Sequence, residues 1–590
     1  MPPSLLPLLG ARAAAAIGVA FGKGVEVAGP LVLPTKDPRH GDHTIAAPMA
    51  LARTLRRPPQ AIATELAAAL DIGDLCEAPE VVAPGFVNLR LRRDWLASQV
   101  REMATDERAG LVAAPEPQHV VVDYSSPNVA KEMHVGHLRS TVIGDCLADV
   151  LEIQGHRVER INHLGDWGTQ FGMLITHLAD TAPEAMEPGA DVDLGDLVAF
   201  YRQAKARFDD DEGFAERSRA RVVDLQAGEA SANAAWAALV GRSKQENQAI
   251  YDLLGVSELE DRGESFYQPM LAEVVADLDA MGLLVVDDGA RCVFVDGFTN
   301  RDGDPLPLII EKADGGYNYA TTDLAAIRHR VGSGADRIVY VVDGGQSQHL
   351  EMVFAVARRA DWLPDHVEAT HVGFGLVLGE DGKRLRTRSG ENVRLQDLLD
   401  EAVERARAFL EVRADERGEP LPDGTDEIAE AVGIGAVVYA DLSQNRQSNY
   451  TFSYDRMLSL KGNTAPYLQY AYARIQSILR EAGWGERPAG SLADAPVELV
   501  ELVEPQEVDL ARALVGLADV LDRVSTEYAP NHLAAHLFEL SQVFNQLYEH
   551  CPVLKAPEPA RTTRLTLCAA TARTLRLGLR LLGIQVVDRI

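Results

Sequence analysis

The sequence predicts a multidomain α/β protein, in which a doubly wound α/β domain with a helical insertion lies between a small α+β domain and an all-α bundle. Three patterns support this prediction. From about residue 116, short apolar runs typical of buried strands alternate with amphipathic helical segments. Helix and strand signals are mixed before that point, and long helical periodicity fills the chain from about residue 430. A chain of 590 residues is also too long for one hydrophobic core.

Residues 1–115 are expected to form the small α+β domain, with Ala113–Pro117 as a linker to the next one. Leu5–Val19 is apolar and rich in alanine, but it lacks a basic lead-in and a convincing cleavage site. We therefore expect a helix of this domain there rather than a secretion signal. The other segments with a helix or strand pattern are Ala46–Arg56, Ala61–Leu70 and Gly85–Leu91.

A strand, a tight turn and a helix open the central domain, which we expect to span residues 116–430. His119–Tyr124 is short and apolar, as a buried parallel strand is. Arg157–Leu164 is the next predicted strand, which completes the first half of a doubly wound fold. The helix between them keeps its apolar positions three or four residues apart, at Val135, Leu138, Val142, Cys146 and Val150.

A charged, alanine-rich insertion is expected over about residues 180–300, mainly helical, with one β-like piece at Arg291–Asp296. The doubly wound fold is expected to resume near residue 308. Its further strand candidates are Leu308–Ile310 and Ile338–Val342, and helices are expected at Val353–Arg359 and Leu395–Phe409. Residues 431–590 are expected to form the helical bundle.

Composition excludes several classes of protein. No apolar run reaches the roughly 20 residues that span a bilayer, so no membrane segment is expected. The five cysteines are scattered and include no Cys-x-x-Cys pair, which supports neither a disulfide framework nor a zinc site and indicates a cytoplasmic protein with reduced thiols. The formal charge of −31 alone would disfavour a nucleic-acid partner, but residues 551–590 carry seven Lys and Arg residues against two acids.

The most informative residues are Pro127–His137, where the first helix of the central domain begins. A helix N-terminus offers unpaired N–H groups and partial positive charge to phosphate. His134 and His137 lie on one helix face, and Gly136 removes a side chain where an adenine ring would lie against backbone. In isolation, His-x-Gly-His also fits two histidines on a helix surface. After a strand and a tight turn, it predicts a doubly wound nucleotide-binding catalytic domain.

This motif resembles the first signature of the class I aminoacyl-tRNA synthetases. The longer runs Asp123–Lys131, His137–Thr141 and Asn162–Gly172 resemble the arginyl-tRNA synthetases in particular, and the resemblance covers nearly the whole chain. It implies arginine–tRNA ligase activity: arginine is activated with ATP and Mg²⁺ to arginyl-adenylate, and is then passed to the 3′ end of its tRNA. The resemblance implies no protein-bound metal.

The resemblance also assigns roles in handling ATP. The run Gly382–Gly390 stands where the second signature of the family belongs, in a degenerate form in which Thr387 replaces the usual second lysine. In relatives with this departure, a lysine just ahead of the first histidine substitutes for it, and Lys131 has that position here. As an isolated charge run, the loop would also fit a solvated turn. The implied catalytic residues are His134, His137, Lys131, Lys383, Arg386 and Arg388, and the implied ATP-binding residues are His134, Gly136, His137 and His349.

Selection of arginine requires carboxylates that match the planar guanidinium group. A polar pocket of this kind can reject lysine and citrulline without proofreading, and the insertion carries no editing signature. Gln348 lies close enough to Gln346 in the motif to remain an alternative to it. The residues that the resemblance implies for arginine binding are Asp123, Ser126, Asn128, Tyr319, Asp323 and Gln346.

The flanking domains are expected to hold tRNA, and the chain is expected to act as a monomer. Residues 1–115 resemble the additional domain that contacts the tRNA elbow in the family, and Ala465–Ile475 resembles the start of its anticodon-binding domain, residues 431–590 here. Two alternative functions are an HxGH nucleotidyltransferase and a catalytically silent relative that binds tRNA or a protein. The residues expected to contact tRNA are Tyr467, Arg561, Arg564, Arg573 and Arg576.

Overall fold

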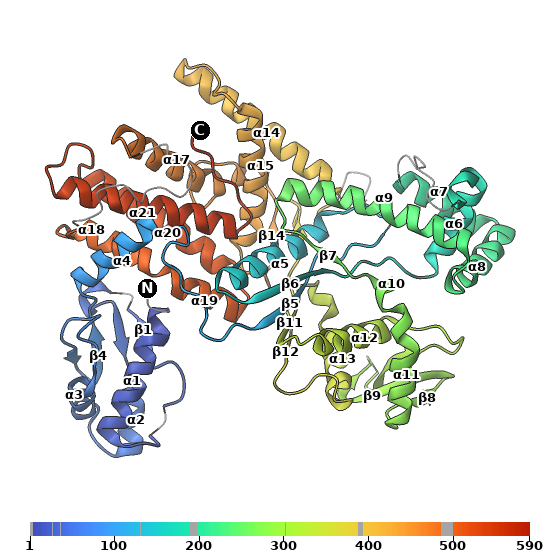
Figure 1. Cartoon of the computed structure of the whole chain (residues 1–590), viewed down its shortest axis with the longest axis horizontal. Helices are drawn as coiled ribbons and strands as arrows, with labels where there is room; N and C mark the ends of the chain where they lie inside the picture. The colour runs from blue at the N-terminus through green and yellow to red at the C-terminus, as the bar shows by residue number, and fades with distance from the viewer. Residues whose placement is uncertain are drawn as a thin grey trace.

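The computed structural model describes residues 4–25, 27–35, 37–129, 131–187, 197–300, 302–386, 393–484 and 500–589. Figure 1 shows a central sheet that joins a helical bundle, drawn in orange and red, to two lobes drawn in green and yellow. A small N-terminal domain, drawn in blue, lies beside the bundle. The predicted multidomain α/β architecture is confirmed.

The N-terminal domain packs three helices on a four-stranded antiparallel sheet. The predicted helix at Leu5–Val19 is α1 (Leu5–Phe21), and the next two predicted helices are α2 (Ala47–Leu55) and α3 (Pro59–Ala69). The predicted strand at Gly85–Leu91 is β4. The strand order of the sheet is β1 (Val32–Pro34), β2 (His43–Ile45), β4 (Phe86–Leu89) and β3 (Glu80–Val82).

The central sheet has five parallel strands, and its first strand in the chain, β5, lies in the middle. The chain continues from β5 to β6 on one side and later returns to place β11 on the other side, so the carboxyl ends of β5 and β11 flank a topological switch point. The strand order is β12 (Glu368–His371), β11 (Arg337–Tyr340), β5 (His119–Asp123), β6 (Arg157–Asn162) and β7 (Glu260–Asp261).

Helices cover both faces of this sheet, as a doubly wound fold requires. Val120 and Val122 point to the core shared with α5 (Val135–Ile153), whereas Val121 points to the core shared with α12 (Tyr319–Gly332) and α13 (Ser347–Arg359). All five apolar positions predicted for the first helix are buried in α5. The core on the α5 side continues into both the N-terminal domain and the bundle.

Two features depart from the expected position of the insertion. The strand β7 joins the parallel sheet from within the predicted insertion, by pairing with β6. The interpretation that the doubly wound fold resumes at Leu308–Ile310 is wrong: β10 (Pro305–Glu311) pairs antiparallel with β9 (Ala290–Thr299), in a separate sheet completed by β8 (Val285–Asp287). Only alternate residues of β10 are buried, which is typical of an antiparallel strand, whereas every residue of β5 is buried.

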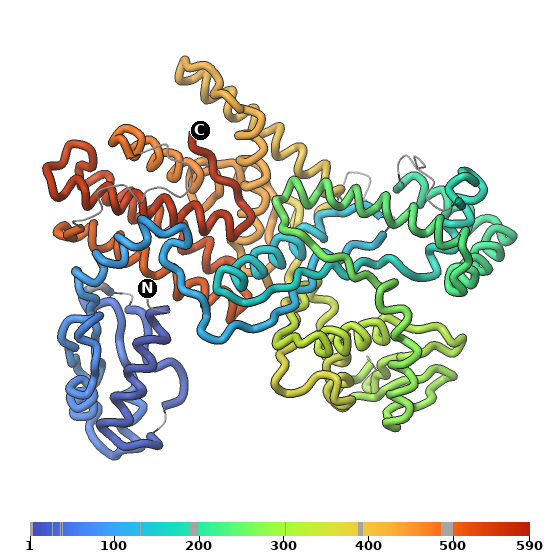
Figure 2. The backbone as a smooth tube through the Cα atoms, viewed as in Figure 1, coloured from blue at the N-terminus to red at the C-terminus, as the bar shows by residue number. Residues whose placement is uncertain are grey.

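The rest of the insertion is helical, as predicted, and a bundle forms the C-terminal part (Figure 2). The helix α4 (Arg93–Thr105) runs from the N-terminal domain to pack on this bundle, against α18 and α21. The helix α6 (Gln170–Thr181) leads into the insertion. The insertion contains α7 (Leu197–Asp210), α8 (Glu212–Gln226), α9 (Ala230–Leu254), α10 (Glu264–Tyr267) and α11 (Leu271–Ala280). The helices after the sheet are α14 (Leu395–Arg417), α15 (Thr425–Leu442), α16 (Tyr454–Met457), α17 (Ala465–Glu481), α18 (Pro505–Val515), α19 (Leu517–Glu527), α20 (Asn531–His550) and α21 (Ala560–Leu581).

A glycine fixes the close approach of α5 to the first strand. A Cβ atom on Gly144 would lie 2.3 Å from the Cβ and Cγ atoms of Tyr124, just after β5. We predict that Gly144→Ala lowers the free energy of unfolding by about 1–3 kcal/mol, the usual cost of overpacking. As a control, Gly10→Ala in α1 meets nothing within 4 Å and should be neutral or stabilising. Thermal unfolding of both variants checks this, and equal midpoints would contradict it.

Candidate functional site

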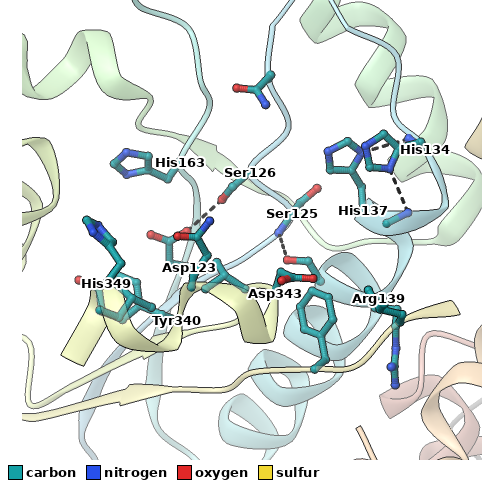
Figure 3. Close-up of a pocket in the computed structure, with 18 of the residues that line it drawn as sticks. Asp123, Ser125, Ser126, His134, His137, Arg139, His163, Tyr340, Asp343 and His349 are labelled. Carbon is teal, nitrogen blue, oxygen red and sulfur yellow. Dashed lines mark hydrogen bonds between the residues drawn. The ribbon is translucent and has the colours of Figure 1, made fainter. Parts of the chain in front are cut away.

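A cavity of about 780 Å³ opens at the switch point of the central sheet, where β5 and β11 end. Figure 3 shows labelled side chains along this cavity, with Ser125, Ser126 and Asp343 between its two ends. At one end lie His134 and His137, and at the other lie Asp123, His163 and His349. Ligands of doubly wound sheets bind at such a switch point, so the fold itself predicts this location.

Both histidines of the HVGH motif are held in one tautomer. The backbone N–H of His134 donates to Nδ1 of His137, and the backbone N–H of Gly136 donates to Nδ1 of His134, each over 3.0 Å. A nitrogen that accepts carries no proton, so each neutral ring carries its proton on Nε2. Burial lowers the pKa of His137 to about 3 and also lowers that of His134. At neutral pH the pair therefore presents two uncharged Nε2–H donors.

The two rings stack, with centroids 4.0 Å apart. A Cβ atom on residue 136 would lie 2.7 Å from Cε1 of His134. Gly136, expected to make room for an adenine ring, thus makes room for the His134 ring first.

The predicted second-signature loop reaches the same cavity only in part. Its base is a short hairpin, in which Leu385 N–H donates to the Val377 carbonyl over 3.1 Å. Arg384, which the sequence analysis did not single out, lines the cavity. Thr387 and Arg388 lie outside the described residues. Lys383 and Arg386 are described but do not line the cavity.

Lys131, the proposed substitute cation, lies near the HVGH histidines. Its charge adds to burial, which is the main cause of the lowered pKa values of His134 and His137. Its Nζ atom lies 5.8 Å from the centre of the Tyr201 ring of α7, within the range of a cation–π contact. The insertion therefore touches a residue that the resemblance places in catalysis.

The turn between β5 and the HVGH motif has strained backbone. Ser125 and Ser126 both have positive φ angles, 67° and 50°, which cost about 1–3 kcal/mol each in residues other than glycine. Ser125 N–H donates to the Ser140 hydroxyl over 2.9 Å, and Ser126 N–H donates to the Asn162 side chain over 3.0 Å. Asn128, also expected at the site, lines the cavity and pairs with Gly165 as a β-bridge. These hydrogen bonds hold a conformation that turns Ser126 and Asn128 to the cavity.

Asp123 forms a buried ion pair that the sequence analysis missed. Arg330, which is 0% exposed, donates from Nη2 to Oδ2 of Asp123 over 2.6 Å. The other oxygen of Asp123 accepts from the Ser126 hydroxyl over 3.1 Å. One half of the Asp123 carboxylate is therefore occupied before any substrate arrives. No local spacing in the sequence signals this pair, because Asp123 and Arg330 are 207 residues apart in the chain.

The other expected arginine-binding residues line the same end of the cavity. Asp323 lies 2.6 Å from Nε2 of His349, and this contact raises the pKa of His349. Tyr319, at the start of α12, is 71% exposed at the cavity rim. Of the two glutamines left open by the sequence, Gln346 lines the cavity.

A third carboxylate at this end was not predicted. Glu264, the first residue of α10, lines the cavity near Asp323. Burial, then the nearby Asp166 and Asp323 carboxylates, raise the pKa of Glu264 to about 7. The sequence did not point to Glu264 because it lies in the segment that was interpreted as an insertion.

Comparisons with known proteins match each part of the chain. Residues 99–454 match the model of the tRNA synthetases class I (R) catalytic domain, residues 9–91 match the arginyl-tRNA synthetase N-terminal domain, and residues 468–590 match the DALR anticodon-binding domain. An arginine–tRNA ligase of a Synechococcus strain is 55% identical over 581 residues, 98% of both chains. That of Thermosynechococcus vestitus is 55% identical over 564 residues, 95% of both chains.

The chain belongs to the arginyl-tRNA synthetase family.

Solved structures of arginyl-tRNA synthetases agree with this assignment. The Plasmodium falciparum enzyme has a TM-score of 0.85 at 28% identity and covers 100% of this chain and 99% of its own. The Thermus thermophilus enzyme has a TM-score of 0.80 at 26% identity, covering 99% and 100%. The resemblance recognised in the sequence is confirmed, and full-length matches support it over a short nucleotidyltransferase.

The C-terminal side chains expected to contact tRNA have different environments. Arg576 is exposed, and Arg561 is half-buried with Glu558 3.7 Å away. Arg573 is half-buried, and burial lowers its pKa. Arg564 is 8% exposed, and its Nε donates to buried Glu507 over 2.8 Å. The guanidinium of Arg564 is therefore engaged inside the bundle, which conflicts with its expected contact with RNA.

Tyr467 is half-buried at the start of α17. Its hydroxyl accepts from the Asn545 side chain over 2.9 Å, and its ring packs at 5.5 Å from that of Phe538.

Across the described ranges, no helix is long and apolar enough to cross a membrane, and no cluster of His, Cys, Asp and Glu has the arrangement of a metal site.

The buried Asp123–Arg330 pair generates a prediction about the stability of the fold. Arg330→Met leaves a buried carboxylate without its cation, so the free energy of unfolding should fall by about 3–5 kcal/mol. Adding Asp123→Asn should restore part of that loss, because the unpaired charge is gone. Arg328→Met, two residues earlier on α12, removes an arginine that pairs with Glu273 and Asp277 near the surface and should cost about 0–1 kcal/mol. Thermal unfolding checks this, and additive losses at positions 123 and 330 would contradict the pairing.

Proposed function

We propose that this chain is an arginine–tRNA ligase, which activates L-arginine with ATP to arginyl-adenylate and pyrophosphate and then transfers arginine to a tRNA. The observation that supports this most is the division of one cavity into two chemically distinct ends. Uncharged histidine donors line the end next to the α5 N-terminus, and carboxylates line the other. A zwitterionic amino acid between them would present its carboxylate to the α-phosphate of ATP.

At the phosphate end, we propose that His134 and His137 donate their Nε2–H groups to phosphate oxygens. The substrate carboxylate attacks the α-phosphorus, the bond to the β-phosphate oxygen breaks, and pyrophosphate leaves. Negative charge on the phosphates grows during this step, so fixed donors stabilise the transition state more than the ground state. Lys131, Arg384 and the loop residues Lys383, Arg386 and Arg388 would add positive charge around the pyrophosphate, and Mg²⁺ would accompany ATP.

At the amino-acid end, we propose that Asp323 and Glu264 bind the guanidinium group of arginine, with Tyr319 closing the rim. Asp123, Ser126, Asn128 and Gln346 would hold the backbone end of the amino acid. This division follows from Arg330, which already neutralises one side of Asp123, whereas Asp323 contacts His349 and Glu264 has the Asp166 and Asp323 carboxylates as neighbours. His349 would exchange its contact with Asp323 for one with ATP or solvent.

The second step requires tRNA. A hydroxyl of the terminal ribose would attack the arginyl carbonyl and release AMP. We propose that the N-terminal domain and the bundle hold the tRNA, with Tyr467, Arg561, Arg573 and Arg576 among the contacts and Arg564 left out. We further propose that the chain acts as a cytoplasmic monomer; all five cysteines are free and buried, which suits a reducing compartment.

Exchange of pyrophosphate into ATP, with and without tRNA, tests the assignment and the pocket together. Asp323→Asn keeps the shape of the side chain but removes a charge opposite the guanidinium. Losing one member of a desolvated pair costs about 2–5 kcal/mol, so arginine activation should fall by roughly 30- to 5,000-fold. Citrulline, which is neutral and nearly isosteric, should lose less or gain. Asp314→Asn, in the exposed turn before α12, is the matched control. A wild type that prefers another amino acid, or a variant that loses all substrates equally, would refute the pocket.

The histidine donors can be tested separately. His134→Ala or His137→Ala should cost about 2–4 kcal/mol of transition-state stabilisation in adenylate formation, as removal of one oxyanion donor does. Folding and tRNA affinity should barely change. His366→Ala, at an exposed position, is the control. Near-normal arginine activation by the double variant at positions 134 and 137 would rule out this role.

The C-terminal arginines predict a salt effect on tRNA binding. Each phosphate contact contributes about 0.9 to the slope of log K against log salt. The double variant Arg561→Gln/Arg576→Gln should therefore bind tRNA more weakly, with a slope shallower by roughly 1 to 2. Its arginine affinity without tRNA should stay unchanged. Arg564→Gln should instead destabilise the bundle, because Glu507 would lose its buried partner. If the salt slope of the double variant equals that of the wild type, Arg561 and Arg576 do not contact tRNA phosphates.

A further inference from the structure

Asp166 anchors the segment that brings Glu264 to the cavity. It lies in the loop after β6 and is 3% exposed. Its Oδ1 accepts from the backbone N–H of Ser265 over 2.9 Å, and its Oδ2 accepts from the Ser265 hydroxyl over 2.7 Å. Both carboxylate oxygens thus bind the residue next to Glu264. A Cβ atom on Gly263 would lie 2.5 Å from this carboxylate, so only glycine allows the approach.

The loop that carries Asp166 is itself held on two sides. The Trp236 indole N–H of α9 donates to the Asp166 carbonyl over 2.7 Å. The backbone N–H of Glu264 donates to the Leu164 carbonyl over 3.0 Å. The position of Glu264 at the cavity wall is therefore fixed from its own backbone, from its neighbour and from the insertion helix behind the loop.

Asp166 also places a second negative charge beside Glu264. The groups that shift the pKa of Glu264 are the Asp166 and Asp323 carboxylates, which raise it, and the Trp167 backbone N–H, which lowers it. The nearby cationic and titratable groups have other contacts: His349 contacts Asp323, Arg330 contacts Asp123, and Arg262 pairs with Glu260 and Glu159. The His163 ring, which also lines the cavity, stacks on the Tyr267 ring with centroids 5.4 Å apart. His329, on the α12 side of α10, contacts the Phe266 ring. Glu264 is therefore a carboxylate that shares its surroundings with like charges.

We propose that Asp166 is a positioning residue for arginine selection, which fixes Glu264 at the cavity wall and, through its negative charge, makes arginine binding release a proton. The proposal rests on the proposed function, because it takes the guanidinium of arginine as the cation that Glu264 meets.

The proton balance is simple. In the free protein near pH 7, part of the Glu264 population carries a proton, since its pKa is raised to about 7. An entering guanidinium keeps its own proton and favours the ionised form of Glu264 over the protonated form. The proton of the Glu264 carboxyl group is therefore released to solvent. Arginine affinity should then rise with pH from about 6 to 8 and level off above that range, where Glu264 is already ionised. The hydrogen bond with Asp323 raises the pKa of His349, so displacement of His349 from Asp323 by the guanidinium favours loss of a proton from that ring as well. The Glu264→Gln variant separates the two sources.

Calorimetry of L-arginine binding to the full-length protein, in two buffers that both titrate near the working pH but differ in ionisation enthalpy, measures the protons released; PIPES and Bis-Tris serve at about pH 6, and Bicine and Tris at about pH 8.5. The wild type should show release that is near one proton at about pH 6 and near zero at about pH 8.5. Glu264→Gln should lose most of it. Asp166→Asn keeps an acceptor for Ser265 but removes the charge, so release at about pH 6.5 should fall to half or less. Glu260→Gln, an exposed carboxylate paired with Arg262, is the matched control and should match the wild type. Citrulline, which lacks the charge, should release none.

Wild type that binds arginine with no buffer dependence would overturn the proposal, and so would Asp166→Asn with the wild-type pH profile. If Asp166→Asn does not fold, the comparison of wild type with Glu264→Gln still decides whether Glu264 is the source of the proton. Failure of the proposed function looks different: the wild type would then not activate arginine in pyrophosphate exchange.

Discussion

The buried ion pair between Asp123 and Arg330 is the interaction on which the geometry of the cavity depends. It joins the end of β5, the central strand of the parallel sheet, to α12, the helix that carries Tyr319 and Asp323. The same strand end leads directly into the strained serine turn and the HVGH helix. The residues just after the end of β5 therefore position the side chains at both ends of the cavity. Both side chains are buried, so separating them would leave an unpaired charge inside the protein. The ion pair therefore keeps the end of β5 in contact with α12.

A second principle is the internal compensation of charge. Asp123 is neutralised by Arg330, Asp323 is matched by His349, and Glu264 retains part of its proton through its acidic neighbours. The histidines at the phosphate end are uncharged. These contacts limit repulsion among the carboxylates, and in the proposed function an entering guanidinium would take the place of His349 at Asp323 and of the proton on Glu264. Such an arrangement favours a cationic side chain without leaving unpaired buried charge in the free protein.

Much of the fold was predictable because its periodicity is strong. The strand His119–Tyr124, the helix that follows it and the C-terminal helices have apolar patterns that only one structure satisfies. The strand at Leu308–Ile310 was assigned to the wrong sheet, because a short apolar run does not reveal whether a strand pairs in a parallel or an antiparallel sheet. At the site, short motifs identified the HVGH histidines and Asp323. Arg330, Glu264 and Asp166 escaped because their roles arise from contacts between segments far apart in the chain, which no local spacing encodes.

The proposed mechanism depends on where each part of the substrate lies in the cavity. The most direct measurement is a crystal structure of the wild type with L-arginine and a non-hydrolysable ATP analogue. We expect the guanidinium within hydrogen-bond distance, about 2.7–3.2 Å, of the Asp323 and Glu264 carboxylates. The Nε2 atoms of His134 and His137 should lie at the same distance from phosphate oxygens. A guanidinium bound away from both carboxylates, or phosphates bound away from both histidines, would contradict this mechanism.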